Sequence, residues 1–315
     1  AFFILSLPKK LIASFAKCEF AQSEVEEIDV VVDDSGTTVK QYISHRIWNI
    51  YRGTQVAPTL LESMHMALEK WLLMYAKTMT PEVLESWCLY LLQNSRSASI
   101  TAIVASVVLA EPSRLFNIAK LLFRTKDFFF FDTARLQLDM SAKGMYAISH
   151  DPTGIFQKER ISTCDDKHRS GSLEHLALSY QVFATTDEGE DVAKHRQEVL
   201  GAIFDEYYKQ LPDKSNEKES DKTWRLYLAR MDRRKMKITT EEKNDQVLIS
   251  FNPEIDPELK QYSEESLAKS SESMKYLTLQ LWSQQRFEGN ENYKKYAQYE
   301  NDDAVVLAEA VDADD

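Results

Sequence analysis

The chain has 315 residues, enough for one large domain or two modest ones, and 43% of them are hydrophobic, enough to bury a substantial core. Its formal net charge of −12 disfavours general affinity for nucleic acid, because binding to phosphates requires a cationic surface. The eight glycines and eight prolines are too few for a turn-rich all-β fold. The three cysteines are far apart, provide no disulfide framework and fit a reducing cytoplasm.

The first residues, Ala-Phe-Phe-Ile-Leu-Ser-Leu, form an apolar run without an initiator methionine. This run is too short to span a bilayer, and it lacks the basic leader of a signal peptide. We therefore expect the chain to be a segment of a longer polypeptide, with any catalytic or nucleotide-binding domain outside it. Residues 7–20 are predicted to form the first helix.

Residues 28–32 are β-prone, but Asp33-Asp34-Ser35-Gly36 follows them, so the sequence predicts a loop with at most a short strand. A short helix is predicted over 42–51. Pro58 then opens a long amphipathic helix over 59–79. Its apolar positions are Leu60, Leu61, Met64, Leu68, Trp71, Leu72 and Tyr75.

Three apolar runs between Leu84 and Arg135 predict three helices packed on one another. In 84–92 the apolar residues, which include Trp87, recur at intervals of three and four. Residues 100–110 carry no charge, so the middle helix is predicted to be buried nearly all round. The rival interpretation is a buried strand, because isoleucine and valine are β-branched. A run of about eleven residues favours the helix.

Residues 144–171 form a polar interruption that contains the turn Asp151-Pro152-Thr153-Gly154. Helices are predicted to resume over 173–183 and 192–211, before a charged linker at 213–221. The remaining predicted elements are a basic helix over 223–237, a short strand within 243–251, a long helix over 257–288 and an acidic helix or tail over 304–315.

Together these elements predict a mainly α fold, a helical-repeat or solenoid-like array of stacked helix pairs with at most a minor β-hairpin. We divide the chain into three parts. Residues 1–143 form a helical packing region, and residues 144–221 combine the polar interruption with helices and the charged linker. Residues 222–315 form a C-terminal helical region with the basic helix and the acidic tail.

The sequence signatures of common catalytic sites do not occur. The chain contains no G-x-x-x-x-G-K-[ST], G-x-G-x-x-G, H-E-x-x-H, C-x-x-C or G-x-S-x-G motif. Cys164, His168 and His175 are zinc-ligand types, but their spacing matches no common site, and we favour a solvated charged loop. The sequence therefore predicts no metal site, no cofactor and no catalytic residue in this segment, and His45 and His65 are interpreted as packed or surface histidines.

One weak pattern offers an alternative. Arg169 and His175 are separated by five residues at a predicted helix start, which resembles the R-x(4–6)-H active site of HEPN ribonucleases. The resemblance implies that His175 acts as general acid or base and that Arg169 stabilises the charge of the phosphorane. Ser170 and Gly171 follow the arginine, where the family usually has a polar Asn, Asp or His.

The basic helix provides candidate binding residues in an acidic chain: Arg225, Arg230, Arg233, Arg234 and Lys235. They could contact nucleic acid or an acidic partner protein. We favour the other interpretation, in which they pair with carboxylates of the same chain. The run Phe128–Phe131 is predicted to be core, with an exposed partner-binding patch as the alternative.

Four blocks resemble the helical-repeat part of large bacterial NTPases of the STAND class, which includes the Avs-type anti-phage sensors. They are residues 47–54, 60–72, 97–112 and 224–236. The resemblance implies a non-enzymatic scaffold or sensor segment of a cytoplasmic NTPase that recognises a protein partner, such as a phage protein. ATP would bind to the parent protein, outside this segment. No membrane contact is expected, nucleic acid is disfavoured, and self-association stays open.

Overall fold

The computed structural model describes residues 24–54, 57–147, 154–182, 189–243 and 246–289, together with Glu291 and Lys294. The elements predicted over 7–20 and 304–315 lie outside the described residues. The described chain is mainly helical, as predicted. It divides into two compact units: unit 1 comprises Ala1–Leu211 and Arg230–Met236, and unit 2 comprises Pro212–Ala229 and Lys237–Asp315.

The described part of unit 1 begins with a β-hairpin where the sequence predicted a loop with at most a short strand. Strands β1 (Glu26–Val31) and β2 (Thr38–Ile43) pair antiparallel. The acidic turn folds the chain back on itself: the Thr37 backbone N–H donates to Asp33 Oδ1 at 2.9 Å, and Gly36 has a φ of 85°. The hairpin forms because Val30 and Ile43 are buried on its inner face.

The short helix predicted over 42–51 begins later than expected. The backbone N–H of Tyr42, in β2, donates to the Arg96 carbonyl at 2.9 Å and keeps this residue extended. Helix α2 (His45–Asn49) follows, and the Ser44 hydroxyl caps it by accepting from the Ile47 N–H at 3.2 Å. A 3₁₀ turn, η2 (Ile50–Arg52), ends at Gly53.

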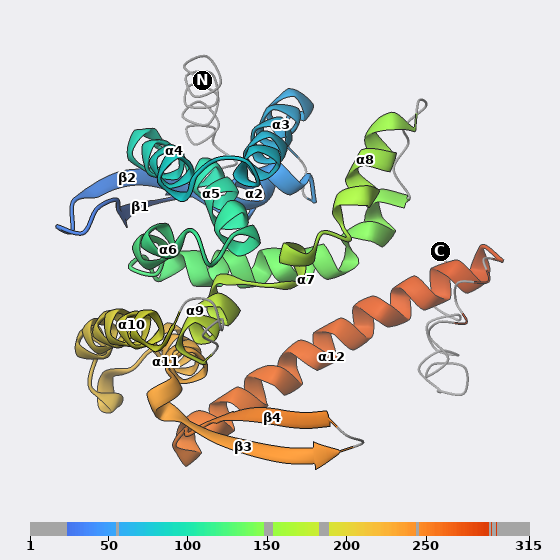
Figure 1. The fold of residues 1–315 in the computed structure, drawn as a ribbon. Coiled ribbons are helices and arrows are strands. Elements are labelled where there is room, and N and C mark those ends of the chain that lie inside the picture. Colours follow the sequence, from blue (N-terminus) through green and yellow to red (C-terminus); the bar gives the residue numbers. More distant parts are fainter. Residues whose placement is uncertain are drawn as a thin grey trace. The chain divides into compact units, whose positions relative to one another are not determined.

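The helix predicted over 59–79 is α3 (Thr59–Ala76), and the three predicted between Leu84 and Arg135 are α4 (Pro81–Asn94), α5 (Ala98–Ala110) and α6 (Phe116–Leu122). Helix α7 (Asp127–Ala147) follows them. In α5 the residues from Ala98 to Val108 are buried without interruption, so the prediction of a helix buried nearly all round is confirmed and the strand alternative is wrong. Helix α5 packs on α2, α3, α4 and α6, and Figure 1 shows it in the middle of unit 1. Each buried isoleucine or valine contributes about 1.5–3 kcal/mol.

The four consecutive phenylalanines lie in the first turns of α7. Phe128 and Phe129 are fully buried, which confirms the prediction of core for these two residues. The Phe128 ring packs 5.2 Å from that of Trp48, and the Phe129 ring stacks 5.7 Å from that of Phe123. These contacts join α7 to α2 and α6.

The polar interruption predicted for residues 144–171 is partly helical. Helix α7 continues to Ala147, and α8 (Ile155–Thr163) and the 3₁₀ turn η3 (Lys167–Ser170) follow. Charged side chains form α8 because they find partners on α3: Arg160 Nη2 lies 2.8 Å from Glu62 Oε2. Helices α9 (Leu173–Val182) and α10 (Glu190–Gln210) follow, as predicted.

The predicted basic helix is shorter than expected. Helix α11 (Glu219–Met231) starts within the predicted linker, which also holds the 3₁₀ turn η4 (Lys214–Asn216). It ends before Asp232, whose carboxylate accepts from the Arg234 N–H at 3.0 Å and starts another 3₁₀ turn, η5 (Arg233–Lys235).

In unit 2, strands β3 (Met236–Lys243) and β4 (Gln246–Pro253) form a second two-stranded sheet. The described part therefore holds two small sheets, and the expectation of at most one minor hairpin is wrong. The strand predicted within 243–251 corresponds to β4, and the long C-terminal helix is α12 (Pro257–Phe287). None of the helices in the described ranges is both long and apolar enough to cross a bilayer.

Candidate functional site

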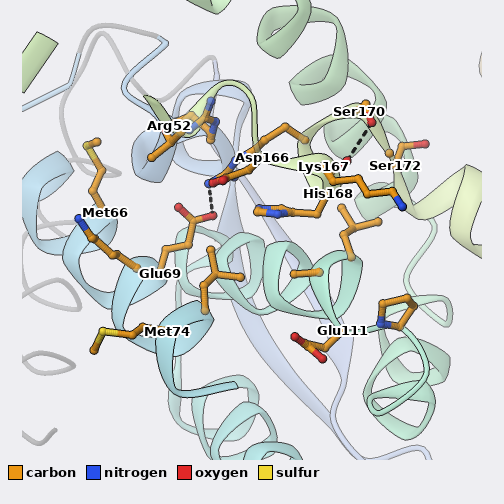
Figure 2. Close-up of a pocket in the computed structure, with 18 of the residues that line it drawn as sticks. Arg52, Met66, Glu69, Met74, Glu111, Asp166, Lys167, His168, Ser170 and Ser172 are labelled. Atoms are coloured by element: carbon orange, nitrogen blue, oxygen red, sulfur yellow. Dashed lines mark hydrogen bonds and ion pairs between the residues drawn. The ribbon is translucent and has the colours of Figure 1, made fainter. Parts of the chain in front are cut away.

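A cleft with a volume of about 1230 Å³ opens in unit 1, lined by α3, α8, η3, α9 and the end of α5. Figure 2 shows Met66, Glu69 and Met74 entering it from α3, opposite Lys167, His168 and Ser170. Arg169 and His175 also line the cleft, so the structure brings the two residues of the predicted R-x(4–6)-H pattern to one cavity.

Arg169 lies at the floor of this cleft and is only 4% exposed. Its Nη2 is 2.7 Å from Glu69 Oε1 on α3, and its Nη1 donates to the Ser106 hydroxyl on α5 at 3.3 Å. The Ser106 hydroxyl in turn donates to Glu69. The guanidinium also lies 5.6 Å from the centre of the Tyr51 ring. Arg169 therefore joins η3 to α3 and α5.

A second buried arginine holds the start of α9. Arg135, on α7, lies 3.0 Å from Asp132 Oδ1 and 3.0 Å from Asp139 Oδ2. It also donates to the backbone carbonyls of Arg169 at 3.1 Å and of Gly171 at 2.5 Å. Asp132 Oδ2 accepts from the first N–H of α9 at 2.7 Å. Burial lowers the pKa of Arg135, but Asp132, Tyr51 and Asp139 together outweigh that cost, and the pKa of Arg135 rises.

A third arginine completes this group. Arg52 Nε donates to Asp139 Oδ1 at 2.6 Å, and Nη1 donates to the Thr163 hydroxyl at 3.4 Å. We call the resulting set of three arginines and three carboxylates, each with a side chain at most 6% exposed, the arginine clamp: Arg52, Arg135, Arg169, Glu69, Asp132 and Asp139. The charges balance, as burial requires, because an unpaired buried ion costs several kcal/mol.

His168 lies between the clamp and the cleft. Burial, followed by the positive charges of Arg169, Arg135 and Arg52, lowers the pKa of His168 to about 3, so the imidazole is neutral at pH 7. Its Nε2 is buried without a hydrogen-bond partner among the described residues, as is the Nε of Arg169. A neutral imidazole adds no further positive charge near the three arginines.

His175 differs from Arg169 in its surroundings. It lies in the first turn of α9, its side chain is exposed, and its backbone N–H donates to the Ser172 hydroxyl at 3.3 Å. Arg169 and His175 both line the cleft, but only the side chain of His175 is exposed. The guanidinium of Arg169 is buried and paired with Glu69. Within the described ranges, no group of three or more His, Cys, Asp or Glu side chains could hold a metal ion.

The five basic residues proposed from the sequence as a binding patch each contact other groups of this chain. Arg225 belongs to unit 2, whereas the other four belong to unit 1. The contacts are Arg225 to Glu217 at 2.7 Å, Arg230 to Glu174 at 2.6 Å, Arg233 to the Gln181 carbonyl at 3.3 Å, Arg234 to Asp205 and Asp232 at 2.7 and 2.9 Å, and Lys235 over the Tyr208 ring at 5.8 Å.

Four partly exposed aromatic rings lie side by side on α3 and α4, and we call them the aromatic strip: Trp71, Tyr75, Trp87 and Tyr90. The Trp71 ring lies 5.2 Å from that of Tyr75 and meets the Trp87 ring edge-on at 5.6 Å. Trp87 meets Tyr90 edge-on at 6.3 Å. Tyr75 is 41% exposed, and the other three are half-buried.

Sequence reasoning missed this strip, because helical spacing placed Trp71, Tyr75 and Trp87 among the apolar residues that face the core. Glu82, Val83 and Ser86 join Trp87 and Tyr90 around a shallow pocket of about 500 Å³ on α4. Hydrogen bonds from its own backbone N–H and from Thr80 lower the pKa of Glu82, which keeps its carboxylate charged at pH 7.

Comparison with models of known protein families gives no match, and comparison with curated proteins gives none either.

Proposed function

We propose that this chain is a non-enzymatic helical scaffold that recognises a protein partner through the aromatic strip. The observation that carries the proposal is the cluster of Trp71, Tyr75, Trp87 and Tyr90 on adjacent helices, each with part of its ring exposed. Tryptophan and tyrosine are enriched at protein interfaces and dominate their binding energy.

The rigidity of the supporting helices favours this role. A recognition surface binds more tightly when its residues are held in the binding geometry before the partner arrives. Helix α3 carries Trp71 and Tyr75, and its inner side is fixed by the ion pair of Glu69 with Arg169 and by packing on α5. Arg114 donates to the carbonyls of Ala76 and Met79 at the end of α3, beside the strip.

The wider setting that we propose is a sensor segment of a large cytoplasmic NTPase of the STAND class, in which helix pairs stack in a solenoid-like array. Residues 60–72, one of the blocks that resemble this class, include Trp71. ATP would bind to the parent protein, and the partner would be a foreign protein such as one from a phage. Self-association of the chain is compatible with this setting.

Selection of displayed random peptides tests the proposal. The full chain, the Trp87→Ala variant and the Leu60→Ala variant are used as targets; Leu60 lies in the first turn of α3 and is 65% exposed. We expect enriched peptides that bind the parent and Leu60→Ala equally and Trp87→Ala about tenfold more weakly. Failure to enrich any peptide whose binding depends on Trp87 would overturn recognition through the strip.

A ribonuclease using Arg169 and His175 is a second candidate, favoured by the presence of both residues in one cleft. His175 would transfer protons, and Arg169 would have to leave Glu69 to stabilise a phosphorane. An RNA-cleavage assay that compares the parent with His175→Ala tests it. Cleavage that the variant loses would support the nuclease, and equal or absent cleavage in both would remove it.

A further inference from the structure

We infer that the occupant of the aromatic strip is a proline-rich segment that carries a basic residue, bound in the polyproline II conformation. This inference rests on the proposed function, because it specifies the partner of the same surface. Aromatic-lined grooves are the usual docking sites of proline-rich segments, which lose little entropy on binding because their helix is already formed.

The spacing of the rings fits such a ligand. Successive rings from Trp71 to Trp87 and from Trp87 to Tyr90 lie 5.6 and 6.3 Å apart in edge-on contacts, and each ring stays partly exposed to solvent. A polyproline II helix advances by about 3.1 Å per residue, so each interval corresponds to about two residues. Pyrrolidine rings of the ligand would therefore pack on the solvent-exposed sides of successive aromatic rings.

Polar groups on the same surface suit the backbone of this ligand. A polyproline II helix has no internal hydrogen bonds, so its carbonyls need donors. Trp87, Tyr90 and Ser86 line the shallow pocket of α4, and each of these side chains carries a hydrogen-bond donor. These groups provide hydrogen bonds that an all-aliphatic surface would not.

The charge of the surface selects a basic ligand. Glu82 lines the pocket beside Trp87, and Glu85 lies on the same helix, where Asn117 Nδ2 donates to its carboxylate at 3.2 Å. An arginine or lysine in the ligand would pair with Glu82, whereas an acidic segment would be repelled. Nucleic-acid bases could stack on the rings, but the carboxylates would repel the phosphates.

The experiment uses the full chain and a fluorescent polyproline peptide that bears one arginine. Matched peptides replace the arginine with glutamate or the prolines with alanine. We expect the first peptide to bind and both substituted peptides to bind at least about tenfold more weakly. Trp87→Ala should weaken binding about tenfold, and Leu60→Ala should leave it unchanged. Glu82→Gln should weaken it about twofold to fivefold and reduce its salt dependence.

Trp87→Phe guards against a folding defect, because it keeps an aromatic ring and should bind more tightly than Trp87→Ala. Equal binding of the proline and alanine peptides, or of the parent and Trp87→Ala, would overturn the inference. If random-peptide selection instead returns Trp87-dependent sequences without proline, protein recognition stands and the proline-rich ligand is wrong. Self-association that Trp87→Ala abolishes would make a second copy the occupant and would likewise overturn it.

Discussion

Arg169 of η3 and Glu69 of α3 form an ion pair of 2.7 Å at the floor of the cleft, although they are far apart in the sequence. Both side chains are buried, at 4% and 6% exposure, and Ser106 of α5 bonds to each of them. The pair therefore joins three segments, and it occupies the guanidinium that the R-x(4–6)-H interpretation needs for catalysis.

Glu69→Gln is expected to destabilise the chain by about 3–5 kcal/mol, because it leaves the buried charge of Arg169 without its counter-ion. Urea unfolding measures the change. Glu159→Gln is the matched control: Glu159 pairs with Lys70 at the surface, where both side chains are exposed, and its loss should cost less than about 1 kcal/mol. Equal effects of the two substitutions would show that the clamp does not stabilise the fold.

The buried side chain of His65 is expected to make the stability of the chain depend on pH. Its Nδ1 lies 2.7 Å from the Leu61 carbonyl, which can only accept, so Nδ1 carries the proton and Nε2 accepts from Ser99 at 2.8 Å. Burial lowers the pKa of His65 to about 4, from an unfolded value of 6.5. Between pH 4 and pH 6.5 the unfolded chain binds more protons than the folded chain. The contribution of neutral His65 to the free energy of unfolding is therefore complete above pH 6.5 and is lost as the pH falls through 4.

The loss from this one histidine is about 3 kcal/mol, from the size of the pKa difference. We expect the free energy of unfolding to fall more steeply between pH 7 and 4 in the parent than in His65→Gln. Unfolding in urea at several pH values measures this. His175→Gln, at an exposed position, is the control and should keep the slope of the parent. If the free energy of unfolding of His65→Gln changed with pH as steeply as that of the parent, the assignment of a neutral buried histidine would be wrong.

Close packing around α5 predicts a large effect of added volume. Ala102 is fully buried in this helix, so Ala102→Leu should force its neighbours apart and cost about 1–3 kcal/mol. Ala67→Leu, at an exposed position of α3, adds the same atoms where there is room and should change stability by less than about 0.5 kcal/mol. Thermal unfolding of the two variants compares them, and similar midpoints would argue against tight packing of α5.

Substitution by alanine is expected to have different effects at two glycines, Gly36 in the turn of the first hairpin and Gly171 before α9. Gly36 has a φ of 85°, and an added Cβ would meet nothing within 4 Å, so Gly36→Ala should cost about 1–2 kcal/mol through backbone strain alone. Gly171 lacks a positive φ, and the nearest atom to its added Cβ would be 3.7 Å away, so Gly171→Ala should be neutral or slightly stabilising. Chemical denaturation measures both. If Gly36→Ala loses no stability, the turn does not need the left-handed conformation.

Local pattern was sufficient for most of the helices. Residues 100–110 carry no charge, so the hydrophobic effect favours burial of this segment on all sides, and the structure confirms this burial for α5. Pro58 and Pro81 mark the starts of α3 and α4, because a proline is tolerated only in the first turn. The phenylalanine run was predicted to be core because no other placement removes so much apolar surface from water, and Phe128 and Phe129 are buried.

Sequence pattern failed where the deciding partner lies on another element. The segment 155–163 was assigned to a polar interruption, but Arg160 forms an ion pair with Glu62 of α3 and belongs to helix α8. In the same way, β1 depends on pairing with β2 across an acidic turn that local rules treat as a break.

The amino-acid sequence by itself determined that this chain is mainly helical and that α5 is a buried helix, because helix periodicity and burial follow from the order of apolar and polar residues. The tertiary structure alone decided that Arg169 is bound by Glu69 and that Trp71 and Trp87 remain partly exposed beside each other. Both outcomes depend on which face of one helix meets another, and that choice is made by packing between segments far apart in the chain.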